Sequence, residues 1–301
     1  MRELVVLGTA GQVPTRERNV NGYLLRWDSE ALLFDPGEGT QRQMLLAGVK
    51  SSSITRILLT HFHGDHCLGL PGVVQRMALD GVTQPAGLYY HASGHGYLER
   101  LLGSSAHFTR APVDLKAVQL AGLVEEGPPF SVTAGRLEHN VPVWGWRIEE
   151  PDGRRMVPER LAALGIEGRS VGELQRTGSI NAGGATVTVD EVSEVRPGQS
   201  FAFIMDTRIC DAAVDLARGA DMVVAESTYL SDREDLAARY GHLTAAQAAT
   251  IAKQAGARLL VLTHYSQRYP QTGPLLEEAR NIFPNTVAAA DLATIPLPPR
   301  R

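Results

Sequence analysis

Short apolar runs alternate along this chain with segments of helical periodicity. Runs that are apolar throughout, or that alternate with polar residues between turn residues, predict strands, and apolar residues at helical spacing predict amphipathic helices. The predicted strands are 3–8, 22–26, 31–34, 54–59, 87–91, 115–120, 130–137, 143–148, 201–205, 222–225 and 258–262. The predicted helices are 40–47, 72–79, 94–102, 211–218, 231–239, 244–255 and 274–282. This alternation indicates an α/β fold, in which helices cover the outer faces of a mixed sheet.

One segment, 153–184, departs from the alternation. It contains two short helical patterns, at 158–164 and 170–176, and its arginines outnumber its acidic residues. We therefore expect a positively charged excursion from a single domain that spans 1–301. On charge alone, a solvated surface insertion is the simpler interpretation.

Composition limits the classes of protein that remain. The chain has 301 residues, of which 44% are hydrophobic, so it can bury a substantial core. No apolar run is long enough for a signal peptide or a membrane span, and we expect a cytoplasmic protein with no membrane partner. The net charge of −4 argues against binding of nucleic acid by bulk attraction, so any anionic partner must bind a local patch. Cys67 and Cys210 cannot form a disulfide framework and are interpreted as packing residues.

A cluster of potential metal ligands follows the fourth predicted strand. Residues 60–70 read THFHGDHCLGL and contain His61, His63, Asp65 and His66. Imidazoles and carboxylates are the ligands that zinc prefers in proteins. At a strand end, alternate side chains such as His61 and His63 point towards one ion, whereas Asp65 and His66 lie past the bend, towards a second. The motif predicts a hydrolytic site for two metal ions, and the alternatives are a histidine-rich surface turn or one structural zinc ion.

Two metal ions need more ligands than this motif supplies. His139, Asp206 and His264 each follow a predicted strand. Binding sites of α/β proteins are built at the carboxyl ends of such strands. Each residue alone could be an ordinary polar residue of a turn, but together the three complete a ligand set.

The histidine motif resembles the H-x-H-x-D-H motif of the metallo-β-lactamase superfamily. The resemblance implies an αββα sandwich with the site at one edge, and Asp35 matches an aspartate that orients the ligands in that superfamily. The implied ligands form two sets that share one carboxylate: His61, His63 and His139 for one zinc ion, Asp65, His66 and His264 for the other, and Asp206 as the bridge between them. Manganese is the alternative metal.

Other segments resemble tRNase Z, the family of endoribonucleases that cut the 3′ trailer from precursor tRNA and leave a 3′-hydroxyl on the tRNA. The likeness extends over nearly the full length of the short form. It is carried by 14–20, similar to P-x-K-x-R-N, by 34–44, similar to D-x-G-E-x-T-Q-x-Q-M, and by 263–269, similar to T-H-x-S-x-R-Y. The substrate contacts that we expect in these segments are Arg16, Arg18, Asn19, Ser266 and Arg268.

The family resemblance also implies roles in catalysis. Glu226 and His242 resemble the pair that protonates the departing ribose oxygen, and Asp65 would orient the attacking water. Without the resemblance, His242 would be an ordinary residue near the start of a helix. The alternative activities on the same scaffold are those of an arylsulfatase or a small-molecule phosphodiesterase, and the alternative without catalysis is a zinc protein that binds RNA.

Segment 153–184 occupies the place of the flexible arm, or exosite, with which tRNase Z grips the elbow of tRNA. In that family the arm of one subunit serves the active site of its partner in a homodimer. The residues that we expect to contact precursor tRNA are Arg154, Arg155, Arg160 and Arg169.

The sequence departs from the family pattern at four places. Met205 replaces the glycine of G-D-T-R, and Ala225 replaces the histidine of H-E-A-T. Arg16 stands where lysine is usual, which keeps the charge but changes the contact geometry. Within the arm, residues 168–170 read Gly-Arg-Ser where Gly-Pro is common, which bears on arm conformation.

Overall fold

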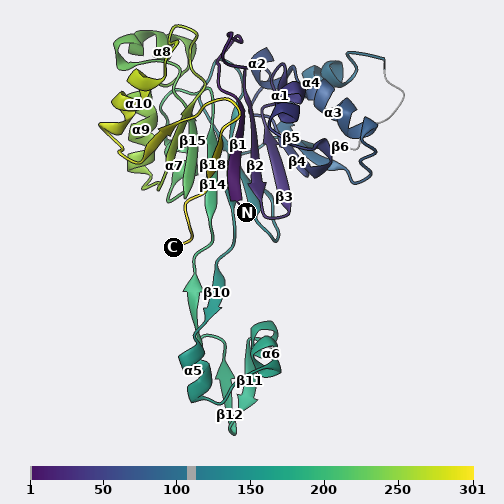
Figure 1. The fold of residues 1–301 in the computed structure, drawn as a ribbon, viewed down its shortest axis with the longest axis vertical. Helices are drawn as coiled ribbons and strands as arrows, with labels where there is room; N and C mark the ends of the chain where they lie inside the picture. Colours follow the sequence, from purple (N-terminus) through teal and green to yellow (C-terminus); the bar gives the residue numbers. More distant parts are fainter. Residues whose placement is uncertain (1, 107–112) are drawn as a thin grey trace.

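Two seven-stranded sheets lie face to face, and helices cover the outer face of each (Figure 1). The computed structural model describes residues 2–106 and 113–301. The first sheet has the strand order β18-β1-β2-β3-β4-β5-β6, and the second has the order β17-β16-β15-β14-β9-β8-β7. This arrangement confirms the predicted α/β sandwich. Within the described ranges, no helix has both the length and the apolar character needed to cross a membrane.

The first sheet is built mostly from the first third of the chain. Its strands are β1 (Arg2–Gly8), β2 (Gly22–Trp27), β3 (Glu30–Phe34), β4 (Arg56–Leu58), β5 (Ala86–His91), β6 (Val113–Val118) and β18 (Thr294–Pro296). The helices of this half are α1 (Thr40–Leu46), α2 (Gly64–Cys67), α3 (Leu70–Leu79) and α4 (His95–Leu102).

The second sheet takes its strands from the remainder of the chain. They are β7 (Gly122–Glu125), β8 (Ser131–Arg136), β9 (Trp144–Glu149), β14 (Ser200–Ile204), β15 (Met222–Glu226), β16 (Leu260–Thr263) and β17 (Thr286–Ala288). The helices of this half are α7 (Asp211–Ala217), α8 (Glu234–Tyr240), α9 (Ala245–Gln254) and α10 (Gly273–Arg280).

The space between the sheets is filled largely by aromatic side chains. Trp27, Trp146, Phe34 and Phe203 are fully buried there, and the ring centroids of Phe34 and Phe203 are 4.7 Å apart. Successive side chains of a strand point to opposite faces, so the same strands also supply a second apolar layer beneath the helices. This double burial explains why inner strands such as β14 and β16 are buried along their whole length and mostly apolar.

Strand direction brings the ends of several strands to one edge of the sandwich. β14, β15 and β16 run parallel, and β8 runs in the same direction because both β8 and β14 are antiparallel to β9. At this edge the Trp144 backbone N–H donates to the Thr60 carbonyl at 3.0 Å, which joins the second sheet to the segment that follows β4. The residues after β4, β8, β14, β15 and β16 therefore meet at the joint between the sheets.

All predicted strands and helices are present, with shifted ends, but several short elements were missed. The strand predicted at 115–120 lies at 113–118, and the following turn leads into β7. β7, β17 and β18 are short strands at sheet edges, where few positions are buried and the apolar pattern is weak. Helix α2, which has four residues, begins directly after His63 and was also missed.

Between β9 and β14 the chain leaves the sandwich and forms a projection (Figure 1). Its elements are β10 (Gly153–Met156), α5 (Pro158–Ala163), α6 (Arg169–Thr177), β11 (Ser179–Ala182), β12 (Ala185–Thr188) and β13 (Ser193–Arg196). The projection continues to Arg196, past the predicted end at 184, because β12 pairs with β11 and β13 pairs with β10. We call residues 153–196 the arm, the paired strands β10 and β13 its neck, and residues 157–192 its lobe.

The lobe has an apolar core that is separate from the clusters of the sandwich. Its buried members are Leu161, Ile166, Leu174, Val187 and Val192. The arm joins the sandwich after β9 and before β14, at the end opposite to the carboxyl ends of β14, β15 and β16. The neck is the part of the arm that connects the lobe to the sandwich.

Replacing Leu174 with alanine should unfold the lobe selectively. Leu174 is fully buried, and removing such a side chain costs about 2–5 kcal/mol, which is large for a core of this size. Amide hydrogen exchange should accelerate in residues 157–192 and stay unchanged in the sandwich. The exposed Leu164→Ala variant is the control, and equal acceleration in β1 and β14 would contradict a separate core.

Candidate metal centre

The predicted ligands converge at the edge where the two sheets join. Their imidazole nitrogens and carboxylate oxygens form groups in which all the ligand atoms lie within 4.8 Å of one another. The groups are His61, His63, His139 and Asp206; Asp65, His66 and His264; and Asp206, His242 and His264. The structure thus brings together all seven predicted ligands, in the two sets that the superfamily resemblance implied, with Asp206 beside both.

The first set surrounds the ring of His63. His63 Nδ1 lies 2.9 Å from His61 Nε2 and 3.3 Å from His139 Nε2. Asp206 Oδ2 lies 3.5 Å from His61 Nε2 and 3.7 Å from His139 Nε2. These nitrogens and the carboxylate oxygen face one small volume.

The second set meets the same carboxylate from the other side. Asp206 Oδ2 is 3.4 Å from His66 Nε2, and Asp206 Oδ1 is 3.1 Å from His264 Nε2. Asp65 Oδ2 lies 3.4 Å from His66 Nε2 and 3.5 Å from His264 Nε2. Asp206 is therefore placed to contribute an oxygen to both sets.

Asp35 fixes two of the imidazoles. Its Oδ2 accepts hydrogen bonds from His66 Nδ1 at 2.8 Å and from the Thr60 hydroxyl at 2.7 Å. The Thr60 hydroxyl donates its own proton to Asp35, so its oxygen, 3.0 Å from His61 Nδ1, accepts a hydrogen bond from the Nδ1–H of that ring. In both rings the proton is held on Nδ1, which leaves the lone pair of Nε2 for the centre.

His139 and His264 are oriented in the same way from the second sheet. His139 Nδ1 donates to the Gly241 carbonyl at 2.8 Å. Gly241 has φ 76°, and a Cβ there would lie 2.7 Å from His139 Nδ1, so only glycine suits this contact. His264 Nδ1 lies 2.8 Å from the Thr228 hydroxyl, which itself donates to Glu226 at 2.5 Å. Nε2 of each ring again faces the centre.

Glu226 is fully buried and binds His242. Its two oxygens lie 3.2 and 3.1 Å from His242 Nδ1, and one of them accepts the backbone N–H of Thr207 at 2.7 Å. Burial lowers the pKa of His242, but the negative charges of Glu226 and Asp206 outweigh it and raise that pKa to about 9. His242 is therefore a buried, protonated imidazole beside the metal ligands.

The donor atoms are suited to cations. Asp206 Oδ1 and His264 Nε2 are buried and have no hydrogen-bond partner among the described residues, which is costly unless a metal ion satisfies them. Burial lowers the pKa of His61, His63 and His139, so these rings are neutral, as metal ligands must be.

The negative charge around His66 also indicates a site for cations. Burial opposes protonation of His66, yet Asp206, Asp65 and Asp35 together raise its pKa well above the ordinary value. Carboxylates buried at this density require compensating positive charge. The residues therefore fit divalent cations, with ligands of the type that zinc takes.

Three of these residues occupy an unusual backbone conformation. Asp35, Asp206 and His264 have φ angles of 42°, 44° and 58°, in the left-handed region that non-glycine residues rarely adopt. Strain of this kind concentrates at functional sites. The positive φ falls on Asp206, and Met205 before it packs in the core between the sheets, so a residue larger than glycine fits there.

The loop after β1 supplies a contact that the sequence analysis missed. The backbone N–H of Gln12 donates to Asp65 Oδ2 at 2.8 Å, from a left-handed conformation with φ 67°. A Cβ on Gly11 would lie 2.7 Å from the His264 ring, so the loop passes directly over this ligand. Backbone donors leave little trace in a sequence, and Gly11 was the one available signal.

The expected substrate residues divide into two groups. Arg16 and Arg268 are exposed. Arg18, by contrast, donates to the carbonyls of Tyr269 and Pro270, at 2.9 and 2.8 Å. The remaining two are also held by the protein: Asn19 donates to the Glu38 carbonyl at 2.8 Å, and Ser266 is buried.

Asp291 is a structural residue of this loop that the sequence analysis missed. It accepts hydrogen bonds from the Thr9 hydroxyl at 2.7 Å and from the Asn19 backbone N–H at 2.6 Å. Burial raises its pKa. A lone acidic residue after the apolar run 287–290 was the signal that could have found it.

Three of the expected RNA contacts in the arm are paired with acidic residues: Arg154 and Arg155 lie in the neck, and Arg160 lies in α5 of the lobe. Arg154 pairs with Asp190, and Arg155 and Arg160 pair with Glu194 at 2.9 and 3.3 Å. Arg169 is the first residue of α6, in the lobe, and is exposed. The preceding Gly168 has φ 56°, so glycine is required at that position whichever residue follows it.

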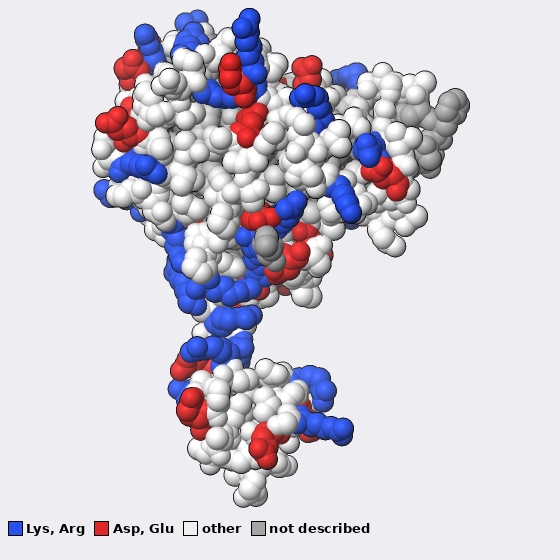
Figure 2. All heavy atoms as spheres, in the orientation of Figure 1, with Lys and Arg blue, Asp and Glu red and all other residues white. Residues whose placement is uncertain are grey.

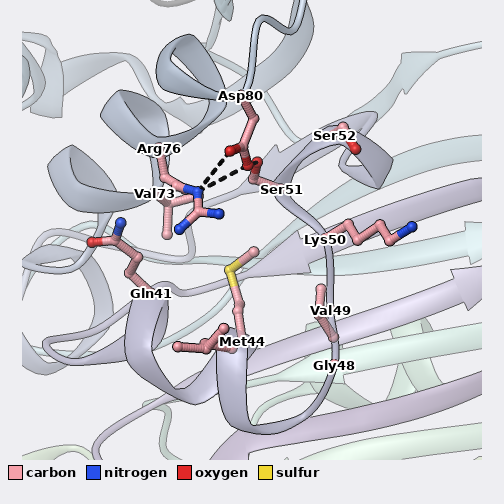
Figure 3. Close-up of a pocket in the computed structure, with 11 residues that line it drawn as sticks. Gln41, Met44, Gly48, Val49, Lys50, Ser51, Ser52, Val73, Arg76 and Asp80 are labelled. Atoms are coloured by element: carbon pink, nitrogen blue, oxygen red, sulfur yellow. Dashed lines mark hydrogen bonds and ion pairs between the residues drawn. The ribbon is translucent and has the colours of Figure 1, made fainter.

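A separate cavity of about 540 Å³ lies between α1 and α3 (Figure 3). Gln41, Met44, Val73 and Arg76 line it, and Arg76 Nε donates to Asp80 Oδ1 at 2.8 Å. None of the metal ligands lines this cavity, so it is distinct from the centre.

The sequence is similar to known families and proteins along its whole length. Residues 15–151 match the metallo-beta-lactamase superfamily, and residues 181–265 match the beta-lactamase superfamily domain. The chain is 58% identical over 304 residues to the ribonuclease Z of Nocardia farcinica, with 100% of this chain and 99% of the relative covered. It is 54% identical over 305 residues to that of Streptomyces coelicolor, with 100% and 99% covered.

Solved structures agree with these matches. Human tRNase Z, short form, superposes with a TM-score of 0.70 at 25% identity, covering 99% of this chain and 100% of that chain. A metallo-beta-lactamase fold protein of Bacillus subtilis superposes with a TM-score of 0.71 at 19% identity, covering 97% of this chain and 98% of that chain, a likeness of fold alone. Sequence identity above 50% to two ribonuclease Z proteins, over the whole chain, establishes the family. The chain belongs to the ribonuclease Z family, within the metallo-β-lactamase superfamily.

Proposed function

We propose that this protein is a metal-dependent endoribonuclease that removes the 3′ trailer from precursor tRNA. The products would be a tRNA with a 3′-hydroxyl and a trailer with a 5′-phosphate. The observation that carries the proposal is the convergence of the predicted ligands, with His242 and Glu226 beside them, in a chain that aligns over its full length with ribonuclease Z proteins.

The metal that we propose is zinc, as two ions per subunit, with manganese as the alternative. Divalent cations held by this centre would make water more acidic and neutralise negative charge on a phosphodiester. The first set, with His63 at its middle, would hold one ion, and the set around His66 the other. Asp206 would contribute to both, and Asp35 would keep the rings in place from behind.

The protein's own groups would move the protons of the reaction. Asp65, held by the Gln12 N–H, would orient the attacking water and accept its proton. Glu226 lies against His242 Nδ1 and raises the pKa of this imidazole, which would donate a proton from Nε2 to the departing 3′ oxygen. The water is the nucleophile, so the 2′-hydroxyl of the ribose is not consumed.

The arm would bind the folded part of the tRNA. Figure 2 shows positively charged side chains gathered at the neck, between the sandwich and the lobe. Arg154 and Arg155 belong to the neck and Arg160 to α5 of the lobe, and each already has an acidic partner, so contacts to phosphate would compete with these pairs. Such contacts recognise shape more than base sequence. That the arm is flexible remains a prediction.

We further propose a homodimer. The arm leaves the sandwich at the end opposite to the metal ligands, so it points away from the centre of its own subunit (Figure 1). An arm that serves a metal centre would therefore have to serve that of a second copy. Leu45 and Leu46 on α1 are 72% and 51% exposed, and contact with a second copy would bury them. A cytoplasmic location also remains a prediction, which cell fractionation would test.

Cleavage of one end-labelled precursor tRNA tests the function directly. We expect a single cut at the start of the trailer, with a 3′-hydroxyl and a 5′-phosphate at the new ends. A chelator should abolish the cut, and added zinc or manganese should restore it. Cleavage that persists after metal removal, or hydrolysis of sulfate esters without cleavage of RNA, would exclude the proposal.

The acid role of His242 should be visible in the pH profile of precursor cleavage. An acid loses activity as pH rises through its pKa, and Glu226 raises that pKa. Glu226→Gln should therefore move the alkaline limb of kcat/KM to lower pH, whereas Glu226→Asp should retain it. His242→Ala should lower kcat by about 100-fold or more while metal content stays unchanged. An alkaline limb that does not move in Glu226→Gln would remove His242 from the acid role.

Removing the arm should separate RNA binding from chemistry. Gly153 and Arg196 are paired in register, so a short Gly-Ser turn can replace 154–195 without pulling on β9 or β14. This variant should lose cleavage of precursor tRNA and keep hydrolysis of bis-p-nitrophenyl phosphate. Equal loss of both activities would refute the division.

Mixed subunits test the homodimer in the same experiment. A subunit without its arm, combined with a His63→Ala subunit that has an arm but a damaged metal centre, should regain precursor cleavage. Each preparation alone should be inactive, which provides the control. Failure of the mixture, with dimers demonstrated by sedimentation, would show that each arm serves its own subunit.

A further inference from the structure

An aromatic column leads from the metal ligands to the surface. Phe62 lies between His61 and His63 in sequence, and its ring stacks on that of Tyr97 in α4, with centroids 6.0 Å apart and an interplanar angle of 27°. A Cβ on Gly94 would lie 2.1 Å from the Phe62 ring, so glycine at this position leaves room for the column. The column is thus tied directly to the loop that carries two of the ligands.

The outer end of the column is open to solvent. Tyr97 is 57% exposed, more than any other aromatic side chain of residues 2–106 and 113–301. The guanidinium of Arg100 lies over its ring, 4.8 Å from the centroid. An aromatic ring with an arginine beside it is the arrangement on which single-stranded bases stack, because every base presents a π face and every nucleotide carries a negative charge.

The position of the column decides which part of the RNA it would meet. His242, the proposed acid for the 3′ oxygen of the tRNA, follows α8, whereas Tyr97 belongs to α4, on the opposite flank of the sandwich (Figure 1). The tRNA strand would therefore lead away past His242. The scissile phosphate stays with the trailer, whose chain would lead away towards Tyr97.

We propose that Tyr97 and Arg100 form a stacking subsite for a base of the single-stranded trailer. This inference rests on the proposed function. The subsite takes any base, since stacking does not read the hydrogen-bonding edge, and it accounts for an exposed tyrosine stacked on Phe62, the residue between His61 and His63. It acts on the binding of the trailer and takes no part in the chemical step.

Precursors that lack single bases provide the test. A series with one abasic nucleotide at each of the first positions of the trailer is cut by the wild-type protein and by Tyr97→Ala. With the wild type, kcat/KM should fall by about fivefold or more at one position of the series, the loss expected for one stacked base. Tyr97→Ala should show the same loss on the intact precursor and no further loss when that base is missing.

Two control variants accompany the test of the stacking subsite. Tyr97→Phe should restore wild-type behaviour because the ring is kept, and Leu79→Ala, an exposed truncation on the neighbouring helix α3, should leave the whole series unchanged. Independent losses from Tyr97→Ala and from the abasic position, or no position effect at all, would overturn the subsite while the proposed function stands. Failure of the wild type to cut any precursor would instead overturn the proposed function.

Discussion

The structure depends on one electrostatic constraint, the burial of several carboxylates at the joint between two sheets. Asp35, Asp65 and Asp206 lie within hydrogen-bond or ion-pair distance of His66, in a region with almost no solvent exposure. Carboxylates buried so close together repel one another unless positive charge lies between them. A proton on His66 would supply part of this positive charge, and divalent cations would supply more. The orientation of His61, His66, His139 and His264, with Nδ1 bound and Nε2 facing the centre, suits divalent cations, and His63 presents its Nδ1 instead.

This constraint also explains the shape of the sandwich edge. The ligands come from segments that are far apart in the chain, so they meet only because β4, β8, β14 and β16 end together. The left-handed residues Asp206 and His264 let the chain turn sharply after β14 and β16, and Gly241 does the same at the end of α8. A rigid aromatic core beneath them keeps the strand ends in register, so the strained turns are supported by packing.

Much of this could be predicted from the sequence, and the exceptions have physical reasons. Most strands and helices were predicted because buried strands are strongly apolar, and the side chains that converge at the edge were singled out because imidazoles and carboxylates at strand ends are conspicuous. Edge strands such as β17 were missed because they bury little. The N–H of Gln12 was missed because a backbone donor has no residue type. The excursion predicted at 153–184 is shorter than the projection, which continues to Arg196, since strand pairing between distant residues leaves no periodic signal.

The two-stranded neck sets the distance between the lobe and the sandwich. A strand advances about 3.3 Å per residue, so inserting matched pairs of residues into β10 and β13 would displace the lobe outward in regular steps without disturbing either core. A ribbon of this kind works as a ruler. The number of residue pairs along the neck would then set how far the part of the RNA that the lobe contacts lies from the bond that is cut.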